Sequence, residues 1–268
     1  MRDSTPTHHR DLAVHRVVSC LVALMIVAST APPTRAEPSA PRFYDEKMAI
    51  AKLPVSELSD EELAYYFAIR WFSSSNYFRA NRFMGIETLQ NPLDVWITQE
   101  VIYEVQPDVI VETGTHFGGS ALLWATILQS INPDARVFTV DIENRQREAS
   151  HRPLWKRRVK FFRGSSTDPA IFQKIVNRTR DKRVLVILDS LHTPEHVKAE
   201  LDLYSKIVPV GSYIIVQDTG IVRPLKASKS GSEGIDAFLA ENDDFVIDSS
   251  RERFRLTNNP GGYLKRIQ

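Results

Sequence analysis

Residues 109–120 combine an apolar run, an acid, a glycine turn and the start of a helical pattern. The apolar run Val109-Ile110-Val111 ends in Glu112, the turn follows, and apolar residues then recur at helical spacing up to Leu128. Glycines let the backbone turn sharply and approach a ligand closely, so we expect a strand, a tight turn and a helix N-terminus here. This unit is typical of α/β proteins that bind a nucleotide-like ligand.

The spacing of the glycines narrows the kind of ligand. It reads Gly-x-x-x-Gly-Gly, whereas dinucleotide-binding turns read Gly-x-Gly-x-x-Gly, so the turn favours S-adenosylmethionine over NAD or FAD. Glu112 can accept hydrogen bonds from amine or hydroxyl groups. In the alternative interpretation, the glycines only turn the chain. The residues expected around the ligand are Glu112, Gly114, Thr115, His116, Gly118, Gly119 and Ser120.

Strand-like and helical segments alternate after residue 107. Strands are expected at 109–112, 137–141, 159–163, 184–189 and 213–218, with helices around 118–130, 145–151, 169–178 and 194–207. Near-continuous Val, Ile and Leu runs separated by helices indicate a parallel sheet covered on both faces. A helix at 233–241 and two strands, around 245–248 and 262–267, then close the sheet as an antiparallel hairpin.

The N-terminal segment 1–36 has the features of a secretory leader. Three arginines precede an apolar run at residues 17–28, and Thr34-Arg35-Ala36 offers a cleavage site. We expect a signal peptide or an uncleaved membrane anchor, and therefore an exported or membrane-associated protein. A misassigned start site would instead leave a cytoplasmic protein. The single cysteine, Cys20, lies in this leader, so the rest of the chain has no thiol for disulfides or zinc.

Residues 37–106 are expected to form a linker and a helical cap, and 107–268 the main domain. The stretch from about 43 to 88 is unusually aromatic and is expected to be helical, either packing on the main domain or lining a substrate pocket. Pro92 opens a further helix that ends before Pro107. The net charge of +1 gives no indication of a nucleic-acid partner.

Polar residues follow the second and third expected strands. Asp141 can hold the two hydroxyls of a ribose, or it caps the next helix. Ser165 and Ser166 can contact an adenine edge, or the same turn only starts the helix near Pro169. Ligands of open parallel sheets bind beyond the carboxyl ends of the strands, which is where all these residues lie.

Acids also follow the fourth and fifth expected strands. Asp189, Gln217 and Asp218 offer two carboxylates and an amide oxygen, a set that suits Mg²⁺. His192 titrates near neutrality and can act as a general base beside that metal. The alternatives are a pair of solvated acids and a histidine that caps a helix, and His196 is expected to be structural. The polar linker 219–232 is either a mobile lid or a plain loop.

Taken together, these motifs resemble the cephalosporin hydroxylase family, which includes rhamnosyl O-methyltransferases. The resemblance covers roughly residues 75–268. It implies a Rossmann-like class I S-adenosylmethionine-dependent methyltransferase fold with a mostly parallel seven-stranded sheet, helices on both faces, an antiparallel C-terminal hairpin and an N-terminal helical cap. The matching segments are 91–94, 109–119, 140–142, 164–166, 188–193, 211–219 and 259–264.

The resemblance also implies roles for individual residues. Asp189 and Asp218 correspond to metal ligands, and His192 takes the place of the lysine base of catechol O-methyltransferase. Gln217 departs from the pattern, because the family usually has an acid there. The predicted function is Mg²⁺-dependent O-methyl transfer to a sugar, a glycolipid or a secondary metabolite by a chain that can form homo-oligomers. Two alternatives stay open, namely a hydroxylase and a non-catalytic exported binding protein.

Overall fold

The computed structural model describes residues 58–59, 63–64, 79–219 and 231–268. The expected leader, the aromatic stretch before residue 79 and most of the linker 219–232 lie outside these residues. Within the described residues, no helix has both the length and the apolar character that a membrane span requires.

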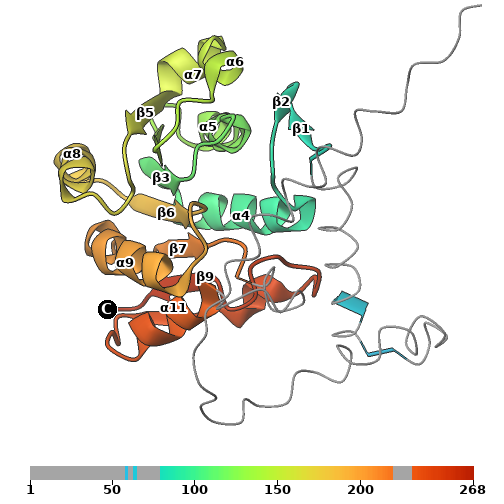
Figure 1. Cartoon of the computed structure of the whole chain (residues 1–268), viewed down its shortest axis with the longest axis vertical. Coiled ribbons are helices and arrows are strands. Elements are labelled where there is room, and N and C mark those ends of the chain that lie inside the picture. The colour runs from blue at the N-terminus through green and yellow to red at the C-terminus, as the bar shows by residue number, and fades with distance from the viewer. Residues whose placement is uncertain (1–57, 60–62, 65–78, 220–230) are drawn as a thin grey trace, which may run out of the picture. The chain divides into compact units, whose positions relative to one another are not determined.

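A seven-stranded sheet forms the centre of the described chain (Figure 1). Its strands follow the spatial order β5-β4-β3-β6-β7-β9-β8, and the first five are parallel. Every residue of β3, β6 and β7 is buried, which is why these segments consist mostly of Val, Ile and Leu. The strands are β3 (Val109–Thr113), β4 (Arg136–Asp141), β5 (Val159–Arg163), β6 (Val184–Leu188), β7 (Tyr213–Val216), β8 (Phe245–Ile247) and β9 (Tyr263–Arg266).

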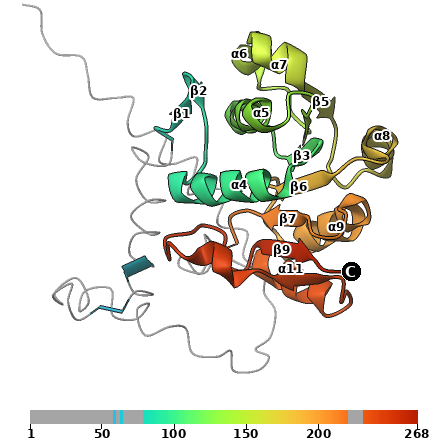
Figure 2. The same cartoon turned by 180° about the vertical axis from the view of Figure 1, so that it is seen from behind.

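Helices cover both faces of this sheet, as the alternation in the sequence predicts. One apolar core joins α4, α5 and α7 to alternate strand residues such as Ile110, and the other joins α8, α9 and α11 to Val109 and Val111. Figures 1 and 2 show these two sets of helices on opposite sides of the strands. The helices are α4 (Pro92–Val105), α5 (Gly119–Ile131), α6 (Arg147–Ser150), α7 (Pro153–Arg158), α8 (Pro169–Thr179), α9 (Pro194–Tyr204) and α11 (Gly231–Leu239).

The C-terminal strands close the sheet in an order that the sequence does not reveal. β9, the last strand in the chain, inserts between β7 and β8 and is antiparallel to both. The expected antiparallel hairpin is therefore confirmed, with β9 rather than β8 next to the parallel strands.

The expectation of helix through residue 88 is wrong for its last ten residues. Arg82–Phe83 and Ile86–Glu87 form a short antiparallel hairpin, β1 and β2. Met84 and Gly85 turn the chain between them with φ of 48° and 87°, and this left-handed backbone is incompatible with a continuing helix. The helix expected at 145–151 is also only part of the observed structure, because α7 follows α6 directly.

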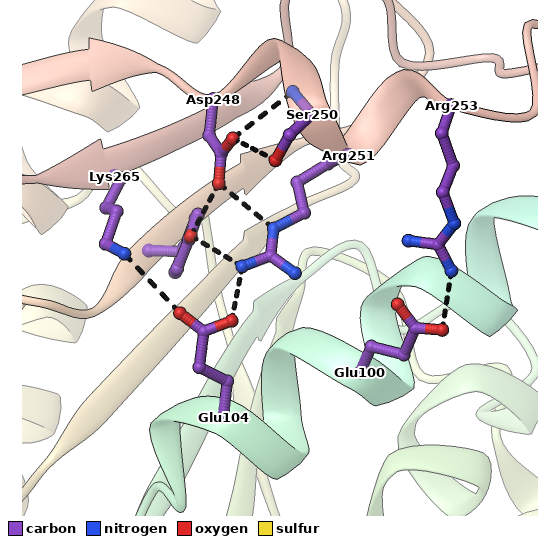
Figure 3. Close-up of polar contacts among 8 residues, drawn as sticks. Glu100, Glu104, Asp248, Ser250, Arg251, Arg253 and Lys265 are labelled. Carbon is purple, nitrogen blue, oxygen red and sulfur yellow. Dashed lines mark hydrogen bonds and ion pairs between the residues drawn. The ribbon is translucent and has the colours of Figure 1, made fainter.

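A cluster of charged side chains fastens α4 to the C-terminal part of the chain (Figure 3). Arg251 lies in the short 3-10 helix η5 (Ser249–Glu252) and pairs with Glu104 of α4. It also contacts Asp248 at 3.0 Å and donates to the Tyr213 hydroxyl at 2.9 Å. Lys265 of β9 reaches the same Glu104 at 3.4 Å. The cluster joins α4 to β7 and β9, and α4 begins at the site described next.

Candidate active site

The glycine turn after β3 packs closely against the ends of the neighbouring strands β4 and β6. Gly114 has φ of 83°, and its backbone nitrogen donates to the Val140 oxygen at 2.8 Å. A Cβ atom at this position would lie 1.8 Å from the Asp189 backbone oxygen. Only glycine fits here, so the turn after β3 and the residues after β6 are packed against each other.

The N-terminus of α5 faces a cavity of about 640 Å³, a size suited to a nucleotide-like ligand. Gly119 and Ser120, the first residues of the helix, lie on its wall. A Cβ at Gly119 would meet the Thr88 hydroxyl oxygen at 2.0 Å, so the segment after β2 closes over the helix end. The free backbone N–H groups of this end favour an anionic group of a ligand.

Asp141 ends β4 at the rim of the same cavity. One carboxylate oxygen accepts a hydrogen bond from the His116 backbone nitrogen at 2.8 Å, and the other accepts from the Glu143 nitrogen at 2.9 Å. These bonds tie the acid to the glycine turn and fix its direction. The geometry agrees with the expected ribose contact, which stays a prediction.

Glu112 lies beneath the turn and is not part of the cavity wall. Its carboxylate accepts from Trp124 at 3.0 Å and from Thr139 at 2.6 Å, and Ser120 is a third partner. Burial raises the pKa of this carboxyl to about 7. In this structure Glu112 braces β3, β4 and α5, and its direct contact with the cofactor stays a prediction.

The structure brings together Asp189, His192 and Asp218. The two acids, which follow the fourth and fifth expected strands, predicted such a cluster. Their ligand atoms lie within 4.8 Å of one another. His192 Nε2 is 3.9 Å from Asp189 Oδ1 and 3.6 Å from Asp218 Oδ2. Burial lowers the pKa of His192, and its ring donates to the Gln217 backbone carbonyl. Converging carboxylates with a neutral imidazole suit a divalent cation.

The two carboxylates of this cluster are difficult to ionise together. Burial raises the pKa of Asp218 to about 7. Burial, followed by the charges of Asp218 and Glu112, holds the pKa of Asp189 well above its ordinary value. A bound cation would offset this repulsion, so the charge distribution also fits a metal.

Gln217 is placed differently from its two predicted partners. It is buried and does not lie on the cavity wall, and its side chain is paired with Gln90. Gln90 also donates to Asp189 Oδ2 at 2.9 Å. No local pattern in the sequence marks Gln90, which is 99 residues away from Asp189 in the chain.

The backbone of Asp218 is held in place by the loop that contains Asn259. This loop belongs to segment 259–264, which resembles the family in sequence and for which we predicted no role. Asp218 has φ of 59°, and its nitrogen donates to Asn259 Oδ1 at 2.9 Å. Asp94 is buried at the start of α4 and accepts from the Asn258 nitrogen at 2.8 Å and from the Thr257 hydroxyl. Burial raises the pKa of Asp94 to about 6. The 91–94 and 259–264 motifs therefore form one scaffold behind Asp218.

The cavity wall also carries a cluster of small polar residues. Ser165 and Ser166 lie on its wall as expected, and Ser166 Oγ is 3.1 Å from His196 Nε2. The same nitrogen is 3.1 Å from Ser190 Oγ, and Ser190 donates to the buried Glu200 at 2.7 Å. His196, expected to be only structural, is also a wall residue. Its signal was its spacing of one helical turn from His192.

Most of the predicted site residues thus surround one cavity. The exceptions are Glu112, Gly118 and Gln217, which support the wall from behind. Residues 87–90, which begin with the last residue of β2, are wall residues that sequence reasoning did not place in the site. The predicted residues on the wall are Gly114, Thr115, His116, Gly119, Ser120, Asp141, Ser165, Ser166, Asp189, His192 and Asp218.

Comparison with protein families supports this picture. The family described as rhamnosyl O-methyltransferase/CmcI matches residues 75–267. A rhamnosyl O-methyltransferase of Mycobacterium tuberculosis (strain H37Rv) is 32% identical over 204 residues, which are 74% of this chain and 82% of the relative. One from Mycobacterium leprae is 30% identical over 205 residues, covering 74% and 88%.

Solved structures share the fold at lower identity. A CmcI structure described as containing Mg and S-adenosylmethionine has a TM-score of 0.56 and 19% identity, covering 89% of this chain and 90% of that one. An apo structure of CmcI has a TM-score of 0.55 and 19% identity, covering 98% and 97%. These similarities confirm the Rossmann-like methyltransferase fold.

Proposed function

The chain belongs to the rhamnosyl O-methyltransferase/CmcI family, and we propose that it transfers the methyl group of S-adenosylmethionine to a hydroxyl group in the presence of Mg²⁺. One observation carries this proposal. The glycine turn and the Asp189–His192–Asp218 cluster open into the same cavity. A methyl donor and a hydroxyl acceptor can react only if one space holds both in the right orientation.

The donor half of the cavity is built from the glycine turn, Asp141 and the Ser165–Ser166 corner. S-adenosylmethionine supplies the methyl group. Asp141 is oriented by the His116 nitrogen so that its oxygens can accept from ribose hydroxyls. Ser165 and Ser166 face the end of the cavity where a base edge would lie. The CmcI structure described with Mg and S-adenosylmethionine supports this choice of cofactor.

The acceptor half is built around the acid cluster. Asp189 and Asp218 would hold Mg²⁺, which would lower the pKa of an acceptor hydroxyl. His192 is partly buried and its lowered pKa keeps the imidazole neutral, so it can accept the hydroxyl proton. The segment 87–90 forms the wall beside this cluster, where it can contact the acceptor.

For the acceptor itself, we propose a sugar hydroxyl on a glycolipid or cell-wall glycan. The support is the name of the mycobacterial relatives, rhamnosyl O-methyltransferase, at 30–32% identity. The comparisons favour methyl transfer over the hydroxylase role, and the relatives give no support to a non-catalytic protein.

The test combines binding with turnover. S-adenosylmethionine is titrated calorimetrically into the full chain with and without Mg²⁺, and transfer of labelled methyl groups to rhamnosyl acceptors is then followed. We expect micromolar binding and Mg²⁺-dependent transfer that Asp189→Ala abolishes without loss of cofactor binding. Folded protein that binds no S-adenosylmethionine in either condition contradicts the function, and unchanged transfer by Asp189→Ala contradicts the metal assignment.

For the cellular location of the protein, we propose export or membrane association because of the pattern of its N-terminal residues. Residues 17–28 are apolar and arginines precede them, which supports export or membrane association. A fusion of residues 1–36 to a reporter that is active only outside the cytoplasm tests this. Reporter activity supports export, and its absence with a soluble product supports the cytoplasmic alternative.

A further inference from the structure

The side-chain amides of Gln90 and Gln217 face each other beside Asp189 of the acid cluster. Gln90 Nε2 donates to Gln217 Oε1 at 2.7 Å, and Gln217 Nε2 donates to Gln90 Oε1 at 3.0 Å. Both residues are buried, with relative exposures of 7% and 4%. Gln90 precedes α4 and Gln217 follows β7, so the two bonds close a reciprocal pair between distant parts of the chain.

The second amide hydrogen of Gln90 is bonded to Asp189. Gln90 Nε2 lies 2.9 Å from Asp189 Oδ2, so this nitrogen serves both Gln217 and the acid. Oδ2 is thereby turned toward the amide pair, and Oδ1 is the oxygen that faces His192 at 3.9 Å. Gln90 therefore determines which oxygen of Asp189 points into the cluster.

Gln217 is not arranged as a third member of that cluster. Asp189, His192 and Asp218 all lie on the cavity wall, whereas Gln217 does not. Its amide oxygen and its amide nitrogen are both engaged by Gln90. An amide oxygen can accept a second bond, but this one is directed at Gln90.

The neighbouring carboxyl groups explain why a neutral side chain suits the position of Gln217. The carboxyl groups of Asp189 and Asp218 are already partly buried and close to each other, with Glu112 adding to the potential at Asp189. A third carboxylate would increase their repulsion in the metal-free protein. A paired amide fills the same space, satisfies its own polar atoms and adds no charge.

We propose that Gln90 and Gln217 form one positioning unit that orients Asp189 toward the bound cation, with Gln217 acting through Gln90 and not as a metal ligand. The inference rests on the Mg²⁺ site of the proposed function. It assigns these two residues to the support of that site. Partners behind metal ligands typically change metal affinity 10- to 100-fold when removed.

A double-mutant cycle tests the unit on the full chain. Mg²⁺ affinity is measured calorimetrically for the wild type, Gln90→Ala, Gln217→Ala and the double variant. We expect each single variant to bind Mg²⁺ about 10-fold or more weakly, and the double variant to be no weaker than the worse single, because either change opens the same pair. Additive losses, or a loss in Gln217→Ala alone, would show that Gln217 is a direct ligand.

Variants that keep the volume guard against a simple packing defect. Gln90→Met and Gln217→Met replace the amides with apolar chains of similar size, and they should weaken Mg²⁺ binding as the alanine variants do. Gln173→Met, on the exposed face of α8, is the control and should change nothing. Wild-type Mg²⁺ affinity in both methionine variants would overturn the inference.

S-adenosylmethionine binding separates this inference from the proposed function. All variants should bind the cofactor like the wild type, because the two glutamine side chains are bonded to each other and to Asp189. If the wild type binds the cofactor but no Mg²⁺, the metal assignment fails and the positioning unit fails with it. If the wild type binds Mg²⁺ and the glutamine variants match it, only the positioning unit fails.

Discussion

Oδ1 of Asn259 accepts a hydrogen bond from the backbone nitrogen of Asp218 at 2.9 Å, and this bond holds the acid in a left-handed backbone conformation with φ of 59°. A non-glycine residue adopts that conformation at a cost, and it persists only where the surroundings enforce it. The direction of the Asp218 carboxylate therefore depends on a side chain 41 residues further along the chain.

Asn259→Ala should weaken Mg²⁺ binding about 10-fold and destabilise the fold by roughly 1–3 kcal/mol, the cost of an unsatisfied buried donor. Calorimetric Mg²⁺ titration and thermal unfolding measure the two effects. Asn242→Ala is the matched control, because Asn242 accepts from the Asp244 nitrogen at 3.0 Å outside the cavity wall. An Asn259→Ala protein with wild-type Mg²⁺ affinity would show that Asp218 is positioned without this bond.

His192→Ala should lower kcat by roughly 10²- to 10⁴-fold, the usual contribution of a general base. Binding of S-adenosylmethionine should persist, and Mg²⁺ affinity should stay within about threefold of the wild type, since a base does not need to bind the metal. Single-turnover methyl transfer and Mg²⁺ calorimetry give the two quantities. A large fall in Mg²⁺ affinity would instead identify His192 as a ligand of the cation, as its place within 4.8 Å of the acids allows.

Glu112→Gln should change how stability depends on pH. The pKa of the Glu112 carboxyl is raised from 4.5 to about 7 by burial. Between these values the unfolded chain loses the proton while the folded chain keeps it, so this acid makes the protein less stable as pH rises. We expect the glutamine variant to gain about 3 kcal/mol relative to the wild type between pH 4.5 and pH 8.

Urea unfolding at several pH values measures this difference in free energy of unfolding. Glu148→Gln serves as the control, because the Glu148 side chain is 72% exposed. Parallel stability curves for the wild type and Glu112→Gln would mean that Glu112 is ionised in the folded protein throughout the range.

Arg251→Ala should destabilise the protein by about 3 kcal/mol, because it leaves the partly buried Asp248 and Tyr213 without their cation (Figure 3). The side chain of Arg251 is only 13% exposed. Arg253 makes one ion pair, with Glu100, and is 43% exposed, so Arg253→Ala should cost less than about 1 kcal/mol. Chemical unfolding measures the free energy of unfolding of the two variants. Equal losses would argue against the conclusion that the cluster fastens α4 to the C-terminal part of the chain.

The fold was accessible from the sequence because its determinants are local. Each buried strand appears as a short Val, Ile and Leu run, and each helix as apolar residues at helical spacing, so strands 109–113 and 184–188 are found within one residue of their expected ends. The hairpin at 82–87 was missed, because each of its strands has only 2 residues, too few for an alternating pattern to be recognised. The position of β9 between β7 and β8 depends on long-range pairing that local patterns do not encode.

The site also combines features that the sequence determines with features that only the folded chain determines. The sequence by itself determined which chemical groups stand at the carboxyl ends of the strands, because a parallel sheet brings Asp141, Asp189 and Asp218 to one edge whatever their distance along the chain. Only the tertiary structure decided the direction of each side chain. Gln90 orients Asp189 across 99 residues, and Glu112 turns under the glycine loop toward Trp124. Such contacts form only when the buried polar groups of a folded chain must all find partners, a requirement that no short segment can reveal.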